Sequence, residues 1–140
     1  MKRIMLDSNV IIDSLAHRKP FCSAADDVML RGAIGDLDLW MSASQVTDVF
    51  YILTGGGAHS RADEGKNRLT RLREHVHVCS IGEPEVDAAL SSVWEDFEDA
   101  CLYQAALKVR ADAIVTRNQK DYRRSTIRVL TCEELLAELA

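Results

Sequence analysis

The chain has 140 residues, 47% of them hydrophobic and 28% charged, which is typical of a globular protein that buries a core. Its formal net charge of −5 argues against a large non-specific contact with duplex nucleic acid, although a site built from carboxylates would lower the charge by itself. There is no signal peptide and no apolar run long enough to span a membrane, so we expect a cytoplasmic protein without a membrane partner. We predict one domain over residues 1–140, because no linker or repeat divides the chain.

Short apolar runs alternate with amphipathic segments along the chain. We predict strands over residues 4–6, 37–41, 75–81, 113–115 and 127–130. We predict helices over residues 9–15, 22–34, 45–53, 60–74, 83–92, 96–110 and 132–139, with Ser8 or Asn9, Ser44 and Thr131 as caps. The three glycines at 55–57 indicate a helix end followed by a loop. Strands that alternate with helices predict an α/β fold with a parallel sheet.

The cysteines and histidines form no metal or disulfide pattern. The four cysteines include no CxxC pair, have no histidine at zinc-finger spacing and lie among apolar residues. We therefore expect small buried thiols in a reducing cytoplasm. The histidines fall away from the predicted strand ends that carry acids, which gives a histidine-based mechanism little support.

Acidic residues follow the first two predicted strands, at the sheet edge where such folds bind ligands. Asp7 comes directly after the first strand, and Asp48 lies in the helix after the second. Asp7 could be a helix cap, but Ser8 and Asn9 can do the same work, so we favour a functional role. Asp48 could also be a solvated residue that interacts with the helix dipole.

The densest acidic group lies at 95–99. Asp96 and Asp99 are three residues apart, and we expect them to share a helix face that continues through Tyr103 towards Leu107 and turns inward. Two like charges on an inward face cost free energy unless a cation neutralises them. Asp96 could equally be a helix cap, and we expect Glu98 to point away into solvent.

Polar residues also follow the strand at 113–115. Thr116 and Asn118 lie at the strand exit, where a phosphate or a metal-bound water could be held, and Asp121 either reaches the same site or caps the next turn. The only dense basic cluster follows, and it either meets a substrate phosphate or is a solvated charge run. This cluster consists of Arg117, Lys120, Arg123 and Arg124.

Oxygen ligands of this kind suit Mg²⁺ or Mn²⁺, which can polarise a phosphoryl oxygen and lower the pKa of a bound water for attack on a phosphodiester. The sequence contains no GxxxxGK[ST], GxGxxG, HExxH or GxSxG motif. The carboxylates therefore carry the functional hypothesis.

Four segments, in order, resemble the PIN domain, the fold of many metal-dependent ribonucleases and of VapC-type toxins of toxin–antitoxin pairs. They are residues 6–10, 42–48, 96–100 and 115–122, and the resemblance extends to residues 131–136. It implies a three-layer α/β/α fold with a central parallel sheet, often homodimeric. It also implies a Mg²⁺- or Mn²⁺-dependent endoribonuclease that acts on RNA, with an antitoxin protein as partner.

The resemblance also implies residue roles. Asp7, Asp48 and Asp99 correspond to the first three acids of the family, and Asp96 adjoins the third. The chain has Asp48 where many relatives have Glu, and Asn118 where many have an acid, a charge that Asp121 could supply. Our predicted catalytic residues are Asp7, Asp48, Asp99 and Asn118, our metal ligands Asp7, Asp96, Asp99 and Asp121, and our substrate-binding residues Thr116, Arg117 and Lys120.

The alternative that we retain is a PIN-like module that binds RNA or a protein with little or no catalysis. A response-regulator receiver is disfavoured, because the last strand is followed by Thr131 and Cys132 instead of a lysine. A phosphatase with an Asp-x-Asp motif is disfavoured, because the segment Asp7-Ser8-Asn9 lacks the second acid.

Overall fold

A computed structural model describes residues 1–140 and contains a five-stranded sheet in the order β3-β2-β1-β4-β5. Every neighbouring pair of strands is parallel, which confirms the predicted fold class. The strands are β1 (Lys2–Leu6), β2 (Leu37–Ser42), β3 (Val76–Cys79), β4 (Ala113–Val115) and β5 (Arg128–Leu130).

The helices lie where the sequence predicts them, with differences of a few residues at their ends. They are α1 (Ser8–Leu15), α2 (Cys22–Ala33), α3 (Ala43–Leu53), α4 (Ala62–Leu72), α5 (Glu83–Leu90), α6 (Phe97–Lys108) and α7 (Cys132–Leu139). Two short 3₁₀ helices, η1 (His59–Arg61) and η2 (Gln119–Tyr122), occur in the connections. None of the helices combines the length and the apolar character that crossing a bilayer would require.

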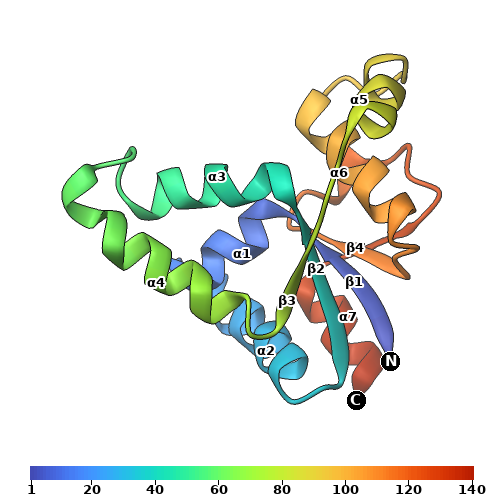
Figure 1. The fold of residues 1–140 in the computed structure, drawn as a ribbon. Coiled ribbons are helices and arrows are strands. Elements are labelled where there is room, and N and C mark those ends of the chain that lie inside the picture. Colours follow the sequence, from blue (N-terminus) through green and yellow to red (C-terminus); the bar gives the residue numbers. More distant parts are fainter.

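The sheet has helices on both faces, as the alternation of its buried side chains requires. Ile4 and Leu6 of β1 join a core cluster with side chains of α1, α2, α3 and α7. Met5, between them, joins a second cluster on the other face with side chains of α6. The result is the three-layer α/β/α arrangement seen in Figure 1. All four cysteines are free, and only Cys22 is partly exposed.

Helices α3 and α4 form an arm that extends away from the sheet (Figure 1). The glycines at 55–57 have φ angles of 64°, 97° and 82°, so they make the predicted break after α3 in a conformation that other residues rarely adopt. Farther along the arm, a Cβ atom on Gly65 would lie 2.7 Å from Thr54 Cγ2 and 2.8 Å from Phe50 Cε2. Glycine at this position therefore allows the two helices to approach closely.

Candidate active site

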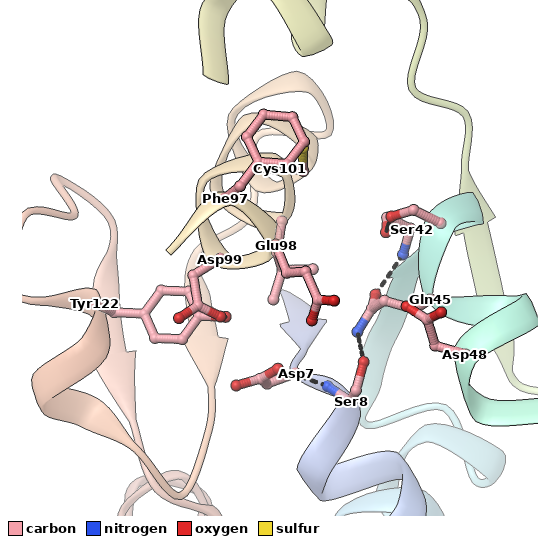
Figure 2. A pocket seen from close by; sticks show the side chains of 12 residues that line it. Asp7, Ser8, Ser42, Gln45, Asp48, Phe97, Glu98, Asp99, Cys101 and Tyr122 are labelled. Atoms are coloured by element: carbon pink, nitrogen blue, oxygen red, sulfur yellow. Dashed lines mark hydrogen bonds between the residues drawn. The ribbon is translucent and has the colours of Figure 1, made fainter. Parts of the chain in front are cut away.

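The parallel register brings the predicted polar residues together at the carboxyl edge of the sheet. Leu6 of β1 pairs with Val115 of β4, so Asp7 and Thr116 follow adjacent strands side by side. A cavity of about 170 Å³ opens at this edge (Figure 2). It is lined by Asp7, Ser8, Ser42, Ser44, Gln45, Asp48, Phe97, Glu98, Asp99, Cys101, Leu102 and Tyr122. The lining includes carboxylates from three segments and no lysine, arginine or histidine.

Asp7 is held by hydrogen bonds to both of its carboxylate oxygens. Oδ1 accepts from the backbone N–H of Ser8 at 2.7 Å, so Asp7 is itself the N-cap of α1, and our expectation that Ser8 or Asn9 caps this helix is wrong. Oδ2 accepts from Thr116 Oγ1 at 2.7 Å and from Asn9 Nδ2 at 3.3 Å. Burial raises the pKa of Asp7, and the hydrogen bonds from Thr116 and Ser8 oppose that rise.

Asp99 enters the same cavity from the first turn of α6. Its Oδ1 accepts a hydrogen bond from the Tyr122 hydroxyl at 3.0 Å. The pKa of Asp99 is raised to about 7, first by burial and then by the negative charges of Asp7, Asp96 and Asp121, against the effect of the Tyr122 hydrogen bond. Asp7 and Asp99 are therefore close enough to repel each other, and no cationic side chain lies between them.

Glu98 is exposed to solvent, as expected, but it also lines the cavity and does not point away from it. Figure 2 shows its carboxylate directed towards the space between Asp7 and Gln45. Asp96 is the N-cap of α6, with its Oδ1 accepting from the backbone N–H of Asp99 at 3.0 Å. Glu98 and Asp99 are consequently both in the first turn, at the sheet edge.

The predicted inward face of α6 is also shorter than expected. Tyr103 is buried, whereas Leu107 is 41% exposed. Asp96, Glu98 and Asp99 therefore lie at the N-terminal end of α6 and not along a fully buried helix face.

Gln45 connects the elements around the cavity, and the sequence analysis missed it. Its Nε2 donates to the Leu6 carbonyl at 2.9 Å and to Ser8 Oγ at 3.1 Å, while its Oε1 accepts from the backbone N–H of Ser42 at 2.7 Å. Ser42, not the predicted Ser44, is the N-cap of α3, in a capping box with Gln45. The Ser-x-x-Gln spacing was the signal that could have identified both residues. Asp48, one turn farther along α3, lines the cavity and is exposed.

Asp96 and Asp121 lie outside this cavity. Both line a neighbouring hollow of about 130 Å³, together with Lys120 and two arginines, Arg123 and Arg124. Asp121 still acts on the main cavity through its charge, which raises the pKa of both Asp7 and Asp99. A ligand role for Asp96 and Asp121 stays a prediction.

Thr116 and Arg117, the two residues that follow β4, have different surroundings. Thr116 is fully buried, and its hydroxyl donates to Asp7 and accepts from the backbone N–H of Asn118 at 3.0 Å. Arg117 instead pairs with the buried Asp13 through contacts of 2.6 and 3.2 Å. Its guanidinium also lies 4.0 Å from the centre of the Phe21 ring. Arg117 is therefore already paired within the protein, and its contact with substrate stays a prediction.

Asn118 is exposed and lines neither the main cavity nor the neighbouring hollow. Its predicted catalytic role stays a prediction.

The donor set of the main cavity fits a hard divalent cation. No three aspartate, glutamate, histidine or cysteine residues lie close enough together to form a complete protein-only cluster. Mg²⁺ does not need one, because it keeps several waters and takes only one or two carboxylates. The carboxylates of Asp7 and Asp99 are oxygen donors of the type such an ion prefers, and their mutual repulsion is the kind of electrostatic cost that a cation removes.

Comparisons with known proteins agree with this architecture. The sequence model of the PIN domain matches residues 3–120. The chain is 28% identical over 141 residues to Ribonuclease VapC1 of Aquifex aeolicus (strain VF5), covering 95% of this chain and 92% of that protein. Its fold is similar to that in the structure of VapBC2 from Rickettsia felis bound to a promoter DNA fragment, with a TM-score of 0.63 and 12% identity over 91% of this chain and 96% of the other. It is also similar to that of FitAB bound to IR36 DNA, with a TM-score of 0.62 and 15% identity over 92% and 94% of the two chains. The chain belongs to the PIN domain family.

Proposed function

We propose that the protein is a Mg²⁺- or Mn²⁺-dependent endoribonuclease that hydrolyses RNA phosphodiester bonds. The observation that carries the proposal is the group of carboxylates around one cavity, Asp7, Asp48, Glu98 and Asp99, without a cationic side chain among the lining residues. The similarity to Ribonuclease VapC1 supports the choice of RNA as substrate.

Asp7 and Asp99 would hold the ion, with Glu98 and Asp48 at the rim of the same cavity. When bound, such an ion supplies Lewis-acid activation of the phosphodiester and of the attacking water. The chain itself keeps the ligands in place: Thr116 and Ser8 fix the two oxygens of Asp7, and Gln45 ties the start of α1 to the end of β2.

The charge of the cavity also predicts that cleavage depends strictly on a divalent ion. A phosphodiester is an anion, so the carboxylates repel it until their charge is neutralised. Lys120, Arg123 and Arg124 line the neighbouring hollow together, and they would contact the adjoining phosphates of the same strand.

We further propose that the protein is the toxin of a toxin–antitoxin pair, a cytoplasmic homodimer whose activity an antitoxin protein inhibits. The support is the similarity to Ribonuclease VapC1 and the shared fold with the VapBC2 and FitAB structures. A small neighbouring gene that encodes a DNA-binding protein, and a complex of the two products on size-exclusion chromatography, are the expected observations.

One observation favours a second candidate, a module that binds RNA or a protein with little catalysis. The cavity lacks a complete cluster of three or more protein ligands, so a metal ion here would depend heavily on water for its coordination.

Cleavage of single-stranded RNA, measured with and without millimolar Mn²⁺, separates the two candidates. We expect Asp99→Asn to lower the Mn²⁺-dependent rate by at least about 100-fold, since loss of a ligand should exceed the loss of an outer-shell partner. Asp27→Asn is the matched control, because Asp27 is an exposed residue of α2 outside the cavity. Near wild-type cleavage by Asp99→Asn would show that the site is wrongly assigned, and no cleavage by the wild type would favour the binding module.

A further inference from the structure

Tyr122 lines the active-site cavity and also belongs to the hydrophobic core of the protein. It is the least exposed of the core side chains in this lining. Only 1% of its surface is exposed, and it belongs to the core cluster that includes Met5, Leu102 and Ile114. The ring of Trp94 meets it edge-on, with the ring centres 5.7 Å apart. This packing fixes the phenol ring and leaves its hydroxyl as the one polar atom that reaches the cavity.

The hydroxyl of Tyr122 makes its hydrogen bond to a predicted metal ligand. It donates to Asp99 Oδ1 at 3.0 Å and is the only protein group that donates to this carboxylate. Tyr122 lines the same cavity as Asp7, and its hydroxyl lowers the pKa of that carboxyl. A phenol has a single proton, so it can donate to only one of the two carboxylates at a time. Asp99 Oδ2 is left without a protein donor.

We propose that Tyr122 is a positioning residue that orients Asp99, relative to Asp7, for a divalent cation. Ligand carboxylates are generally hydrogen-bonded by an outer shell that fixes their orientation. Asp7 has such a shell in Thr116, Ser8 and Asn9, whereas Asp99 has only Tyr122. The hydroxyl holds one oxygen of Asp99 and leaves the other for the ion. This inference relies on the metal site of the proposed function, but not on its RNA substrate.

The Tyr122→Phe variant tests the proposal, because it removes the hydroxyl and keeps the ring in the core. The matched control is Tyr103→Phe. Tyr103 belongs to the same core cluster and stacks on Trp94 with ring centres 4.7 Å apart, but its hydroxyl bonds Thr126 Oγ1 at 2.8 Å, away from the acids. Each variant therefore loses a tyrosine hydroxyl from the same core cluster, and only the Tyr122 hydroxyl belongs to a residue that lines the cavity.

Two quantities are measured on the purified full-length protein: the Mn²⁺ dissociation constant by titration calorimetry, and the thermal midpoint without divalent ions. We expect Tyr122→Phe to bind Mn²⁺ about 10- to 100-fold more weakly than the wild type. We expect Tyr103→Phe to remain within about twofold, because its hydroxyl has no contact with a ligand. A purely structural role of the Tyr122 hydroxyl would change the midpoint and leave the Mn²⁺ affinity unaltered.

Three results would overturn the inference: equal Mn²⁺ affinity in Tyr122→Phe and the wild type, an equal loss in both tyrosine variants, or a Tyr122→Phe protein that is unfolded at room temperature. These results are distinct from a failure of the proposed function. A wild type that binds Mn²⁺ but does not cut RNA would contradict the ribonuclease proposal alone. A wild type that cuts RNA while Tyr122→Phe binds Mn²⁺ normally would contradict only the role of Tyr122.

Discussion

The aspartates near the two ends of α1 have opposite surroundings. Asp13, near the end of the helix, is 1% exposed and forms two contacts with the guanidinium of Arg117. Asp7, at its start, is more accessible, yet its donors are hydroxyl and amide groups, and its charged neighbours are the acids Asp99 and Asp121. The partners of the two aspartates are consecutive in the sequence. Thr116 donates a hydrogen bond to Asp7, and Arg117 forms an ion pair with Asp13.

This difference shows where the chain neutralises its own charge and where it does not. A buried carboxylate with a bidentate arginine is complete, and another cation would gain little there. Two neighbouring carboxylates without a cation gain free energy when an external one arrives. Of the two sites, only the Asp7–Asp99 region is therefore suited to an ion from solution.

The largest effect on stability should come from breaking the ion pair between Asp13 and Arg117. Arg117→Leu leaves Asp13 buried without a counter-charge, so we expect the free energy of unfolding to fall by about 3–5 kcal/mol. Arg123→Leu is the control, because its 3.4 Å ion pair with Glu95 is exposed on both sides and should be worth less than about 1 kcal/mol. Urea unfolding measures both changes. Similar losses in the two variants would remove the contrast between the sites.

A smaller effect on stability should come from removing the Thr116 hydroxyl, which donates a hydrogen bond to Asp7. Thr116→Val keeps the shape of the side chain but removes the donor to Asp7 and the acceptor for the Asn118 N–H, so we expect about 1–3 kcal/mol of destabilisation. We also expect Mn²⁺ to bind about 10-fold more weakly. Thr116→Ser retains the hydroxyl and should retain most of the Mn²⁺ affinity. Calorimetry on the two variants is the measurement, and equal affinities would mean that Thr116 does not support the site.

The smallest effect should be the pH dependence of the metal-free protein. The pKa of Asp99 is raised from 3.8 to about 7 in the folded state, so the native protein binds more protons than the unfolded chain between these values. Its stability should therefore decrease as the pH rises through this window. Asp99 is only half-buried, so we expect a change of a few degrees in the thermal midpoint.

Asp99→Asn provides the control for this pH profile. It should flatten the decrease and leave the part that Asp7, whose pKa is also raised, contributes. Millimolar Mn²⁺ should reverse the trend in the wild type, because the ion binds the ionised carboxylate and its stabilisation grows with pH. Identical profiles in the wild type and Asp99→Asn would contradict the raised pKa of Asp99.

Much of the fold could be predicted because its signals are local. Apolar runs such as Ile4-Met5-Leu6 predict buried strands, and the strand ends then indicate where Asp7 and Thr116 meet. The capping choices were harder, because Asp7, Ser8 and Asn9 are all competent and only the backbone conformation decides among them. At α6, the sequence indicates that Asp96 can cap the helix, but it does not indicate that Glu98 lines the cavity.

The partner of Arg117 could not have been predicted in this way. Asp13 lies 104 residues earlier in the sequence, and neither residue has a local pattern that indicates the other. The basic cluster at 117–124 predicts a phosphate contact for Arg117 but does not indicate its ion pair with Asp13. The position of Arg117 beside Asp13 and Phe21 depends on how α1 and the strand exit of β4 pack together.

The pairing of β1 with β4 has a consequence for the protein during its own synthesis. The hydrogen bond between Thr116 and Asp7 spans 109 positions of the chain, so the first carboxylate lacks this support until most of the sequence has been translated. Chains generally begin folding from the N-terminus as they leave the ribosome. A nascent chain still short of Tyr122 therefore lacks the hydroxyl that holds Asp99, and one still short of Thr116 also lacks the hydroxyl that holds Asp7.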